Sequence, residues 1–302
     1  MNPKVSIIIL NWNGADDTIA CLSSLKKIDY PNYEIIFVDN HSMGNDVEVV
    51  EKIHKDILKT TIETDKNLGF SGGNNKGIEY ALNNSADYIL LLNNDTIVEP
   101  DFLSKLMKNI NLDENIGIYT PLINYYSDPN TIWCAGGFVS KIRASGFPYG
   151  INKNEKDFSV DRYCTFASGC CMLIKREVIE KIGMLDENYF LYLEDTDYCV
   201  RTVNAGYKIK YVGSSKIYHK VFSTTGKVNS LLPLYYSVRN RLHFAKKNFG
   251  KLFYASFLYI SFVFLVKSIT NRNLGSKGLR LIIAAYKDFF QNKMGRSARF
   301  DS

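Results

Sequence analysis

The chain has 302 residues, of which 46% are hydrophobic and 23% are charged, proportions that exclude a disordered or fibrous protein. Its net charge of +6 conceals an asymmetry. Residues 201–302 contain 19 Lys and Arg but only two acidic residues, an excess of +17, whereas residues 1–200 contain 18 basic and 29 acidic residues, an excess of −11. An acidic body with a basic tail indicates an anionic partner for the tail.

Strands and helices are expected to alternate over the first 110 residues. Apolar or β-branched runs predict strands at Val5–Leu10, Glu34–Val38, Thr60–Thr64 and Tyr88–Leu92. Helices are predicted after a cap at Asp16 or Asp17, over 47–57, over Gly77–Leu82 and from Pro100 to about Ile110. This alternation predicts an α/β fold with a mostly parallel sheet that carries helices on both faces.

Residues 121–163 are rich in turn signals, and we expect little regular structure there. The pattern after them predicts strands at Cys170–Ile174, Tyr207–Val212 and Lys216–Tyr218 and helices at Arg176–Ile182 and Glu194–Ala205. Further along, the chain becomes basic, aromatic and helical in pattern. We therefore expect two units, an α/β domain over 1–225 and a helical C-terminal extension over 226–302.

Polar clusters follow three of the predicted strands, at residues 11–14, 39–42 and 93–95. In a parallel sheet the carboxyl ends of the strands meet at one edge, and ligands bind there. The clusters therefore predict a binding site at this edge of the sheet.

Two of the polar segments suggest a ligand with phosphate groups, although each also has a structural explanation. The Gly- and Asn-rich stretch from Asn67 to Gly77 is expected to form a turn, either to bring backbone N–H groups to a phosphate or to shape the chain. It matches neither GxGxxG nor the Walker motif, which disfavours dinucleotide and P-loop chemistry. Asn93-Asn94-Asp95 offers either oxygen ligands for Mg²⁺ or Mn²⁺ or a polar turn before the next helix.

Acidic and histidine residues later in the chain are candidates for catalysis. Glu194, Asp195 and Asp197 begin a predicted helix, where they either stabilise the helix N-terminus or supply a general base for a hydroxyl group. His219 is either structural or a metal ligand. Trp133 either stacks on a sugar ring or belongs to the core.

The order of these motifs along the chain resembles that of the inverting glycosyltransferases of family two, which have the Rossmann-like GT-A fold. The resemblance extends over about the first 225 residues and is carried by Val5–Asn13, Val38-Asp39-Asn40, Asn67–Gly77, Leu91–Asp95, Glu194-Asp195 and His219. The Asn-Trp-Asn-Gly opening and the basic tail are most similar to bacterial rhamnosyltransferases that assemble surface polysaccharides.

The resemblance implies a role for each matching residue. Donor binding is implied for Asn11, Asp39, Asn67, Gly72, Gly73, Asn74, Asn93 and Asn94. It further implies that Asp95 and His219 hold the cofactor, Mg²⁺ or Mn²⁺, and that Asp195 is the catalytic base, with Glu194 beside the acceptor. Trp133 is a further candidate for acceptor binding. The chain departs from the family's Asp-x-Asp element at Asn93, which removes one negative charge from the metal site.

The basic tail contains two segments that indicate contact with an anionic membrane surface. As a helix, Leu252–Val266 would span only about 22 Å, which is less than the ~30 Å hydrocarbon core of a membrane. This length favours a helix that lies in the membrane interface over one that spans the membrane. The alternative is a helix buried in the protein core. Around Leu279–Phe290 apolar residues recur at helical spacing beside Lys277, Arg280, Lys287 and Lys293. No helix-turn-helix, RRM or zinc pattern supports nucleic acid as the partner.

These features together predict a metal-dependent inverting hexosyltransferase, cytoplasmic and peripheral on the inner face of the cell membrane. The expected reaction moves a sugar, with rhamnose as the candidate, from a UDP- or dTDP-sugar donor to a saccharide acceptor linked to polyprenyl diphosphate. Two alternatives are a sugar nucleotidyltransferase, which needs a triphosphate loop that is absent after Leu10, and a non-catalytic nucleotide-sugar-binding assembly protein. No pattern in the sequence specifies an oligomeric state.

Overall fold

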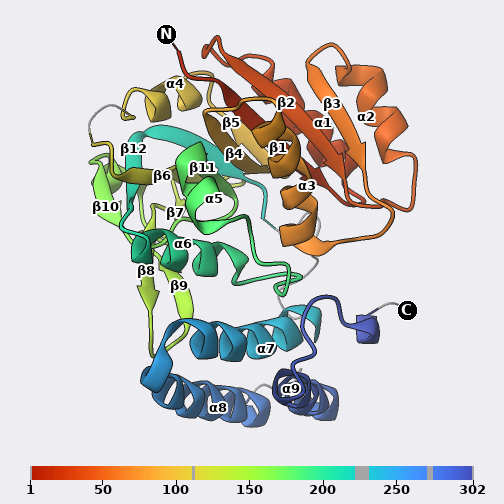
Figure 1. The fold of residues 1–302 in the computed structure, drawn as a ribbon, viewed down its shortest axis with the longest axis vertical. Coiled ribbons are helices and arrows are strands. Elements are labelled where there is room, and N and C mark those ends of the chain that lie inside the picture. Colours follow the sequence, from red (N-terminus) through yellow and green to blue (C-terminus); the bar gives the residue numbers. More distant parts are fainter. Residues whose placement is uncertain (1, 111–112, 222–230, 271–274, 301–302) are drawn as a thin grey trace.

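A ten-stranded sheet forms the centre of the computed structural model, which describes residues 2–110, 113–221, 231–270 and 275–300 (Figure 1). Its first four strands are β1 (Val5–Asn11), β2 (Tyr33–Asp39), β3 (Leu58–Glu63) and β4 (Tyr88–Asn93). They lie in the order β4-β1-β2-β3, and each pairing among them is parallel. The predicted α/β fold is confirmed, and the predicted strands differ from these by one or two residues at their ends.

Helices cover both faces of this part of the sheet. Successive residues of a strand point to opposite faces, and β1, β2 and β4 are mainly apolar, so both faces must be covered. The helices are α1 (Ala15–Leu25), α2 (Asp46–His54), α3 (Gly69–Asn83) and α4 (Phe102–Met107). Leu10 of β1 packs against α3, where a Cβ atom added at Gly73 would lie 2.4 Å from its side chain. Asn11 points to the other face, where Thr18 of α1 donates a hydrogen bond to it (2.8 Å).

The Gly- and Asn-rich stretch that the sequence analysis assigned to a turn is the first half of α3, and the helix begins at Gly69 rather than Gly77. Glycine disfavours a helix by about 1 kcal/mol relative to alanine. The glycines are needed here because α3 lies so close to β1 that a Cβ atom at Gly77 would be 2.6 Å from Ile8. Close packing therefore outweighs the low helix propensity of the segment.

Two further helices differ slightly from their predictions. α1 begins at Ala15, so Asp16 and Asp17 lie inside its first turn, and no side-chain hydrogen bond caps the helix. Their carboxylates still interact favourably with the positive end of the helix dipole. α4 ends at Met107 rather than near Ile110.

The other half of the sheet contains several strands that the sequence did not predict. They are β5 (Thr96–Val98), β6 (Ile116–Tyr125), β7 (Ile132–Cys134) and β10 (Arg162–Cys164), and a separate hairpin consists of β8 (Gly137–Ser140) and β9 (Ser145–Pro148), with a short helix η1 (Glu155–Phe158). The expectation of little regular structure over 121–163 is therefore wrong. Pro121 lies inside β6, where it is tolerated because it pairs with Val212 next to an irregularity in the neighbouring strand.

The remaining strands and helices of the body agree well with the sequence pattern. They are β11 (Cys171–Lys175), α5 (Arg176–Ile182), α6 (Glu194–Asn204) and β12 (Lys208–His219). β12 joins the two short strands that were predicted separately, and its register against β6 shifts between Val212 and Lys216. β11 is antiparallel to both β4 and β6 and so connects the two halves of the sheet.

The C-terminal region forms a helical layer at the bottom of Figure 1. Its elements are α7 (Leu231–Asn248), η2 (Gly250–Leu252), α8 (Phe253–Thr270), α9 (Gly275–Phe290) and η3 (Ala298–Phe300). These helices surround a second hydrophobic cluster, which also includes Tyr189 and Leu193 of the body. The expected domain boundary between residues 225 and 226 lies outside the described residues.

Helix α8 is longer than the sequence analysis assumed. Among the described residues, Gly250–Ser268 is the stretch long and apolar enough by length and composition to cross a membrane, and only 17% of it is buried. The expected length of about 22 Å is therefore wrong, because the helix continues to Thr270. The interfacial position of this helix stays a prediction. One face of α8 nevertheless packs against the neighbouring helices through Ile260 and Phe264.

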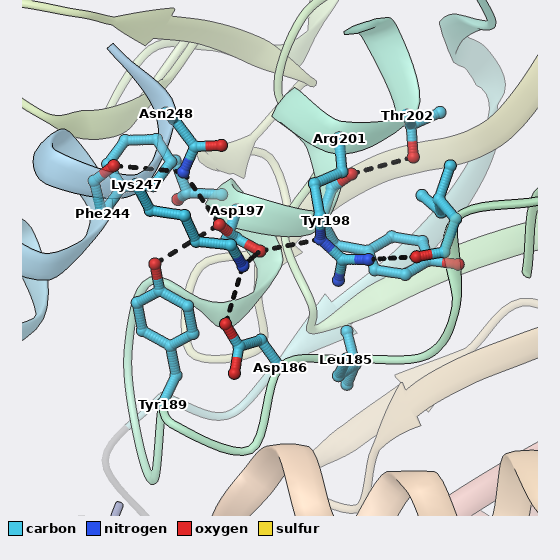
Figure 2. A network of polar contacts seen from close by, with 12 residues as sticks. Leu185, Asp186, Tyr189, Asp197, Tyr198, Arg201, Thr202, Phe244, Lys247 and Asn248 are labelled. Carbon is cyan, nitrogen blue, oxygen red and sulfur yellow. Dashed lines mark hydrogen bonds and ion pairs between the residues drawn. The ribbon is translucent and has the colours of Figure 1, made fainter. Parts of the chain in front are cut away.

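A polar network ties the C-terminal helices to α6 (Figure 2). Asp197 of α6 is fully buried and accepts hydrogen bonds from Arg201 (2.8 Å) and, on α7, from Lys247 and Asn248 (2.9 Å each). Arg201 also donates to two main-chain carbonyl groups of the segment after α5. Arg201 is thus a structural partner of an acidic residue in the same helix. The network holds α6 in a defined position relative to α7.

We predict that Asp197→Ala lowers the free energy of unfolding by about 3 kcal/mol, because it removes a fully buried carboxylate that accepts hydrogen bonds from Arg201, Lys247 and Asn248. Urea denaturation followed by circular dichroism measures the change. Glu79→Ala is the matched control, since Glu79 pairs with Lys76 on an exposed helix surface, where ion pairs contribute about 1 kcal/mol or less. A loss for Asp197→Ala no larger than that of the control would contradict the structural role of the network.

Candidate active site

A cavity of about 890 Å³ lies at the carboxyl ends of the parallel strands. Its walls combine segments that are far apart in the chain: residues 93–95 after β4, Glu194 and Asp195 at the start of α6, and His219 at the end of β12. Tyr236 of α7 and Phe300 close it on the side of the C-terminal region. The structure therefore brings the predicted catalytic and metal-binding residues to one cavity, at the edge where the polar clusters predicted a ligand.

Asn11 and Asp39 form a buried framework behind the cavity rather than part of its lining. The Asn11 amide nitrogen lies 2.8 Å from Asp39 Oδ1 and 2.9 Å from Asp46 Oδ2. Ser42 donates to the Asp39 carboxylate from both its N–H (2.9 Å) and its hydroxyl (2.6 Å). Asn94 donates to Asn11 Oδ1 (3.3 Å). These hydrogen bonds hold the ends of β1, β2 and β4 together.

The other residues expected to bind the donor divide into two groups. Asn67 and Asn93 line the cavity, as Asn94 also does. Gly72, Gly73 and Asn74 lie within α3, and among the described residues they are not part of the cavity lining. The two glycines allow the close packing of the helix, so the structure gives these three residues a structural position. Their role in donor binding stays a prediction.

Backbone strain is concentrated around the site. Asn13 (φ 52°) and His41 (φ 66°) follow β1 and β2, and Tyr192 (φ 71°) and Leu193 (φ 75°) directly precede α6. A left-handed conformation costs a residue with a Cβ atom about 1–2 kcal/mol, and such residues cluster at functional sites. The consecutive pair turns the chain sharply at the point where the helix with the catalytic candidates begins.

Asp195 and Glu194 are adjacent carboxyl groups in different environments. Asp195 Oδ2 accepts a hydrogen bond from the N–H of Gly169 (3.1 Å), and its Oδ1 accepts one from the N–H of Thr196 (2.6 Å). Burial raises the pKa of Asp195, although these hydrogen bonds act in the opposite direction. Burial, and then the charge of Asp195, raise the pKa of Glu194 far above its usual range. The pair therefore consists of one carboxyl group that is held by two N–H donors and a second one whose raised pKa favours its protonated form.

Asp95 and His219 form the second polar pair of the cavity. Both are buried, and Asp95 Oδ1 lies 3.1 Å from His219 Nε2. Adjacent ligands of a six-coordinate cation with bonds of about 2.1 Å are about 3 Å apart, so this pair fits two positions around Mg²⁺ or Mn²⁺. Across the part of the chain that the structure describes, no three His, Cys, Asp or Glu side chains group to hold a metal.

Trp133 lines the cavity and packs edge-on against the imidazole of His219, with ring centroids 4.5 Å apart. The indole thus has both a structural contact and a surface toward the cavity. Trp12, which the sequence analysis quoted only as part of a motif, also lines the cavity and is 42% exposed. An exposed aromatic ring at a strand end is a surface on which a base or sugar ring can stack.

Asn240 of α7 holds the strained turn before α6, and the sequence analysis missed it. Its buried side-chain amide donates to the carbonyl groups of Leu191 (2.9 Å) and Tyr192 (3.0 Å), which are 49 and 48 residues away in the chain. An isolated Asn in a basic helix gives no local signal of this role. The contact makes the C-terminal region part of the structure that positions Asp195.

The start of α3 supports the same turn from the other side. The N–H of Phe70 donates to the carbonyl of Phe190 (2.8 Å), and Gly69 (φ 73°) lies so close that an added Cβ atom would be 2.2 Å from that oxygen. Asn75 exchanges two hydrogen bonds with the main chain of Leu185 (3.0 and 3.1 Å). The Gly- and Asn-rich segment therefore fixes the loop that leads to Glu194.

The fold and the strand-edge cavity define a GT-A protein. Solved structures with this fold include the mannosyltransferase PcManGT from Pyrobaculum calidifontis in complex with GDP-Man and Mn²⁺, with a TM-score of 0.61 and 15% identity over 97% of this chain and 88% of that one. Another is GalNAc-T7 with UDP, GalNAc and Mn²⁺, with a TM-score of 0.66 and 17% identity over 96% of this chain and 56% of that one.

Residues 6–183 match glycosyl transferase family 2, and the chain belongs to this family. Its relatives include dTDP-rhamnosyl transferase RfbF from Shigella flexneri, 25% identical over 265 residues that cover 82% of each chain. The low-salt glycan biosynthesis hexosyltransferase Agl10 from Haloferax volcanii is 28% identical over 255 residues, 83% of this chain and 78% of that one. The family resemblance inferred from the motifs is confirmed. Asp195 and His219 lie beyond the matched segment.

We predict that Gly69→Ala lowers the free energy of unfolding by about 2 kcal/mol or more, because the new Cβ atom meets the Phe190 carbonyl and requires a left-handed conformation of Ala. Urea denaturation measures the loss. Gly44→Ala is the control, because a Cβ atom there meets only Asp46 Oδ1 at 3.5 Å. Equal stability of the two variants would contradict the close packing of α3 against this loop.

Proposed function

We propose that the protein is an inverting, cation-dependent hexosyltransferase that moves a sugar from a UDP- or dTDP-sugar to a saccharide carried on polyprenyl diphosphate. The observation that carries this proposal is the presence, on one cavity, of the buried Asp95–His219 pair and of Asp195 with its elevated pKa. Rhamnose is the candidate sugar, because one of the relatives, which aligns with 82% of this chain, is a dTDP-rhamnosyl transferase.

In this proposal the donor lies along the strand ends, against Trp12, Asn67 and Asn93. Asn11 and Asp39 shape this part of the site through their hydrogen bonds to each other and to the neighbouring strand ends. Asp95 and His219 would hold a divalent cation, whose positive charge would stabilise the departing nucleoside diphosphate. The complex of PcManGT with GDP-Man and Mn²⁺ supports both a nucleotide-sugar donor and a cation.

Asp195 is the proposed general base. It takes the proton from the acceptor hydroxyl as that oxygen bonds to the anomeric carbon, while the bond from this carbon to the diphosphate oxygen breaks and its electrons leave with the nucleoside diphosphate. A single displacement of this kind inverts the anomeric configuration. The elevated pKa makes Asp195 a stronger base, and the N–H groups of Gly169 and Thr196 orient its carboxylate. Glu194, as a neutral acid, donates a hydrogen bond to the acceptor without adding negative charge.

We predict that Asp195→Asn lowers the rate of transfer about 10²- to 10⁴-fold and leaves donor affinity unchanged, because only the proton acceptor is lost. In the wild-type enzyme the base must be deprotonated, so transfer falls as the pH is lowered through its pKa. Since that pKa is raised, the acid limb of the rate profile lies above the ordinary Asp value of about 3.9. Transfer onto a panel of prenyl-diphosphate-linked sugars and calorimetry with UDP- and dTDP-sugars measure the two quantities.

Two further variants make this test specific. Asp95→Asn is expected to weaken donor binding in Mn²⁺ to the level that wild type shows in EDTA, and Asp101→Asn, a substitution on an exposed helix end, is expected to change neither quantity. Undiminished transfer by Asp195→Asn would refute its role as base. Failure of every donor to bind in Mn²⁺ would refute the transferase proposal. Donor binding without transfer to any acceptor would favour a nucleotide-sugar-binding protein, and synthesis of a nucleotide sugar from a nucleoside triphosphate would favour a nucleotidyltransferase.

Peripheral attachment to the inner face of the cell membrane is the second part of the proposal. On α8, Tyr254, Leu258 and Phe262 recur every four residues and are 72, 69 and 66% exposed, so they form one apolar stripe. The exposed basic residues of α9 are Lys277, Arg280 and Lys287. Because the opposite face of α8 packs against protein, this arrangement supports a helix that lies in the membrane interface rather than one surrounded by lipid.

We predict that the double substitution Leu258→Ser and Phe262→Ser weakens binding to vesicles of phosphatidylcholine and phosphatidylglycerol by roughly a hundredfold, since each lost side chain contributes about 1.5–3 kcal/mol when buried in lipid. Vesicle co-sedimentation measures the affinity. Met43→Ser with Val160→Ser is the control, because these exposed apolar residues lie on the body. Equal vesicle binding by both double variants would contradict the role of α8.

A further inference from the structure

A second cavity, of about 450 Å³, adjoins the candidate active site. It lies between α7, the end of α9 and the segment 293–299. Arg296 and Ser297 line both cavities. The shared wall is held by two contacts to residues of the first cavity: the Ser297 N–H donates to the Tyr236 hydroxyl (2.9 Å), and the Arg296 guanidinium lies 3.5 Å from the Asn67 carbonyl.

Positive charge dominates the second cavity. Among the described residues its lining includes four cations, Arg239, Lys293, Arg296 and Arg299, and one carboxylate, that of Asp288. Asp288 is already engaged, because Arg299 lies 3.2 Å from it and the Tyr235 hydroxyl donates to it (2.6 Å). Among the described residues, Arg239 and Lys293 therefore add positive charge to the lining beyond the Asp288–Arg299 pair.

Arg239 makes this charge a built-in feature of the fold. It is 1% exposed, and its guanidinium donates to the carbonyl groups of Lys293 (3.3 Å) and Gly295 (2.7 Å) and to the Tyr235 hydroxyl (3.4 Å). Within the described part of the chain, none of its hydrogen-bond partners is a carboxylate. A buried cation without an anion raises the affinity of its surroundings for one. Arg239 thus fixes the segment 293–295 and leaves its charge uncompensated.

The residues at the mouth of the cavity are able to reach a ligand. Lys293 is exposed, and 43% of the Arg299 side chain is exposed even while it contacts Asp288. Guanidinium groups bind phosphate oxygens through paired hydrogen bonds, and lysine binds them as a point charge. The lining chemistry therefore suits a phosphate or diphosphate ester rather than a sugar or a neutral lipid.

We propose that this basic cavity binds the diphosphate group of the prenyl-linked acceptor, which places the attached saccharide in the adjoining cavity beside Asp195. The inference rests on the proposed function, because it concerns the acceptor of that reaction. The surroundings support it: Phe290, at the end of α9 that borders the cavity, is 66% exposed, and the apolar stripe of α8 belongs to the same helical layer. A prenyl chain that leaves the cavity therefore meets apolar surface.

The test is a direct binding measurement that needs no transfer reaction. Calorimetry with geranyl diphosphate, and separately with inorganic pyrophosphate, is carried out in EDTA, so that no cation at Asp95 contributes to binding. Lys293→Gln and Arg299→Gln remove charge at the cavity mouth. Lys287→Gln is the matched control, because it removes an exposed charge from α9 outside the cavity lining. Circular dichroism and urea denaturation of each variant confirm that it folds.

We expect geranyl diphosphate to bind wild type and the control equally, and to bind each mouth variant roughly tenfold more weakly, as loss of a charge-assisted contact predicts. Vesicle affinity of Arg299→Gln should stay at the wild-type value. No binding of geranyl diphosphate to wild type, or no difference between mouth variants and control, would overturn the proposal. Tighter binding of inorganic pyrophosphate than of geranyl diphosphate would overturn it in favour of a free-ion site.

One further result separates this site from a lipid headgroup site. If the mouth substitutions weaken vesicle binding but leave geranyl diphosphate binding unchanged, the cavity serves membrane phospholipid and the proposal is wrong. Donor binding in Mn²⁺, measured on the same proteins, tests the transferase function independently. If donor binding holds and geranyl diphosphate binding fails, the cavity proposal is wrong. If donor binding fails, the transferase proposal is wrong.

Discussion

The left-handed turn at Tyr192 and Leu193 is the constraint on which the candidate active site depends. Two consecutive residues with Cβ atoms adopt this unfavourable conformation only when their surroundings hold them there. The hydrogen bonds of Asn240 to this turn, and that of Phe70 to the adjacent Phe190 carbonyl, hold it from two sides. The turn determines where α6 begins, and therefore where the Asp195 carboxylate meets the cavity.

The C-terminal helices consequently belong to the site rather than to a separate attachment module. Asn240 positions the turn, Tyr236 and Phe300 line the cavity, and Lys247 and Asn248 anchor the buried Asp197 of α6. Buried charges and amides have few alternative arrangements that satisfy them, so these contacts specify one position of α6 relative to α7. In the proposed peripheral attachment, the orientation of the helical layer would therefore also set the orientation of the cavity.

Much of the fold and the chemical part of the site are predictable from sequence because their signals are local. Apolar runs mark the strands of the parallel half, and the acidic and amide residues at their ends converge because parallel strands share an edge. The glycines of α3 predict a turn instead of a helix, because the sequence does not show that β1 packs closely against them. The strands over 121–163 depend on pairing with other strands, so their own sequence gives little signal. The role of Asn240 cannot be predicted from local sequence either, because its hydrogen-bond partners lie 48 and 49 residues away in the chain.

The charge asymmetry of the chain also takes on a more specific meaning. Several cations of the basic tail are used within the fold: Arg201 and Lys247 hold Asp197, and Arg239 binds main-chain carbonyl groups. An excess of +17 over residues 201–302 therefore overstates the charge available to a partner. Among the described residues, part of what remains lies on the exposed surface of α9 and part in the cavity beside the active site. Surface charge attracts a whole membrane over a Debye length, whereas a cavity that contains a buried guanidinium selects a single anionic group. A transferase that acts on a lipid-linked substrate needs both kinds of attraction, one to reach the membrane and one to place the acceptor.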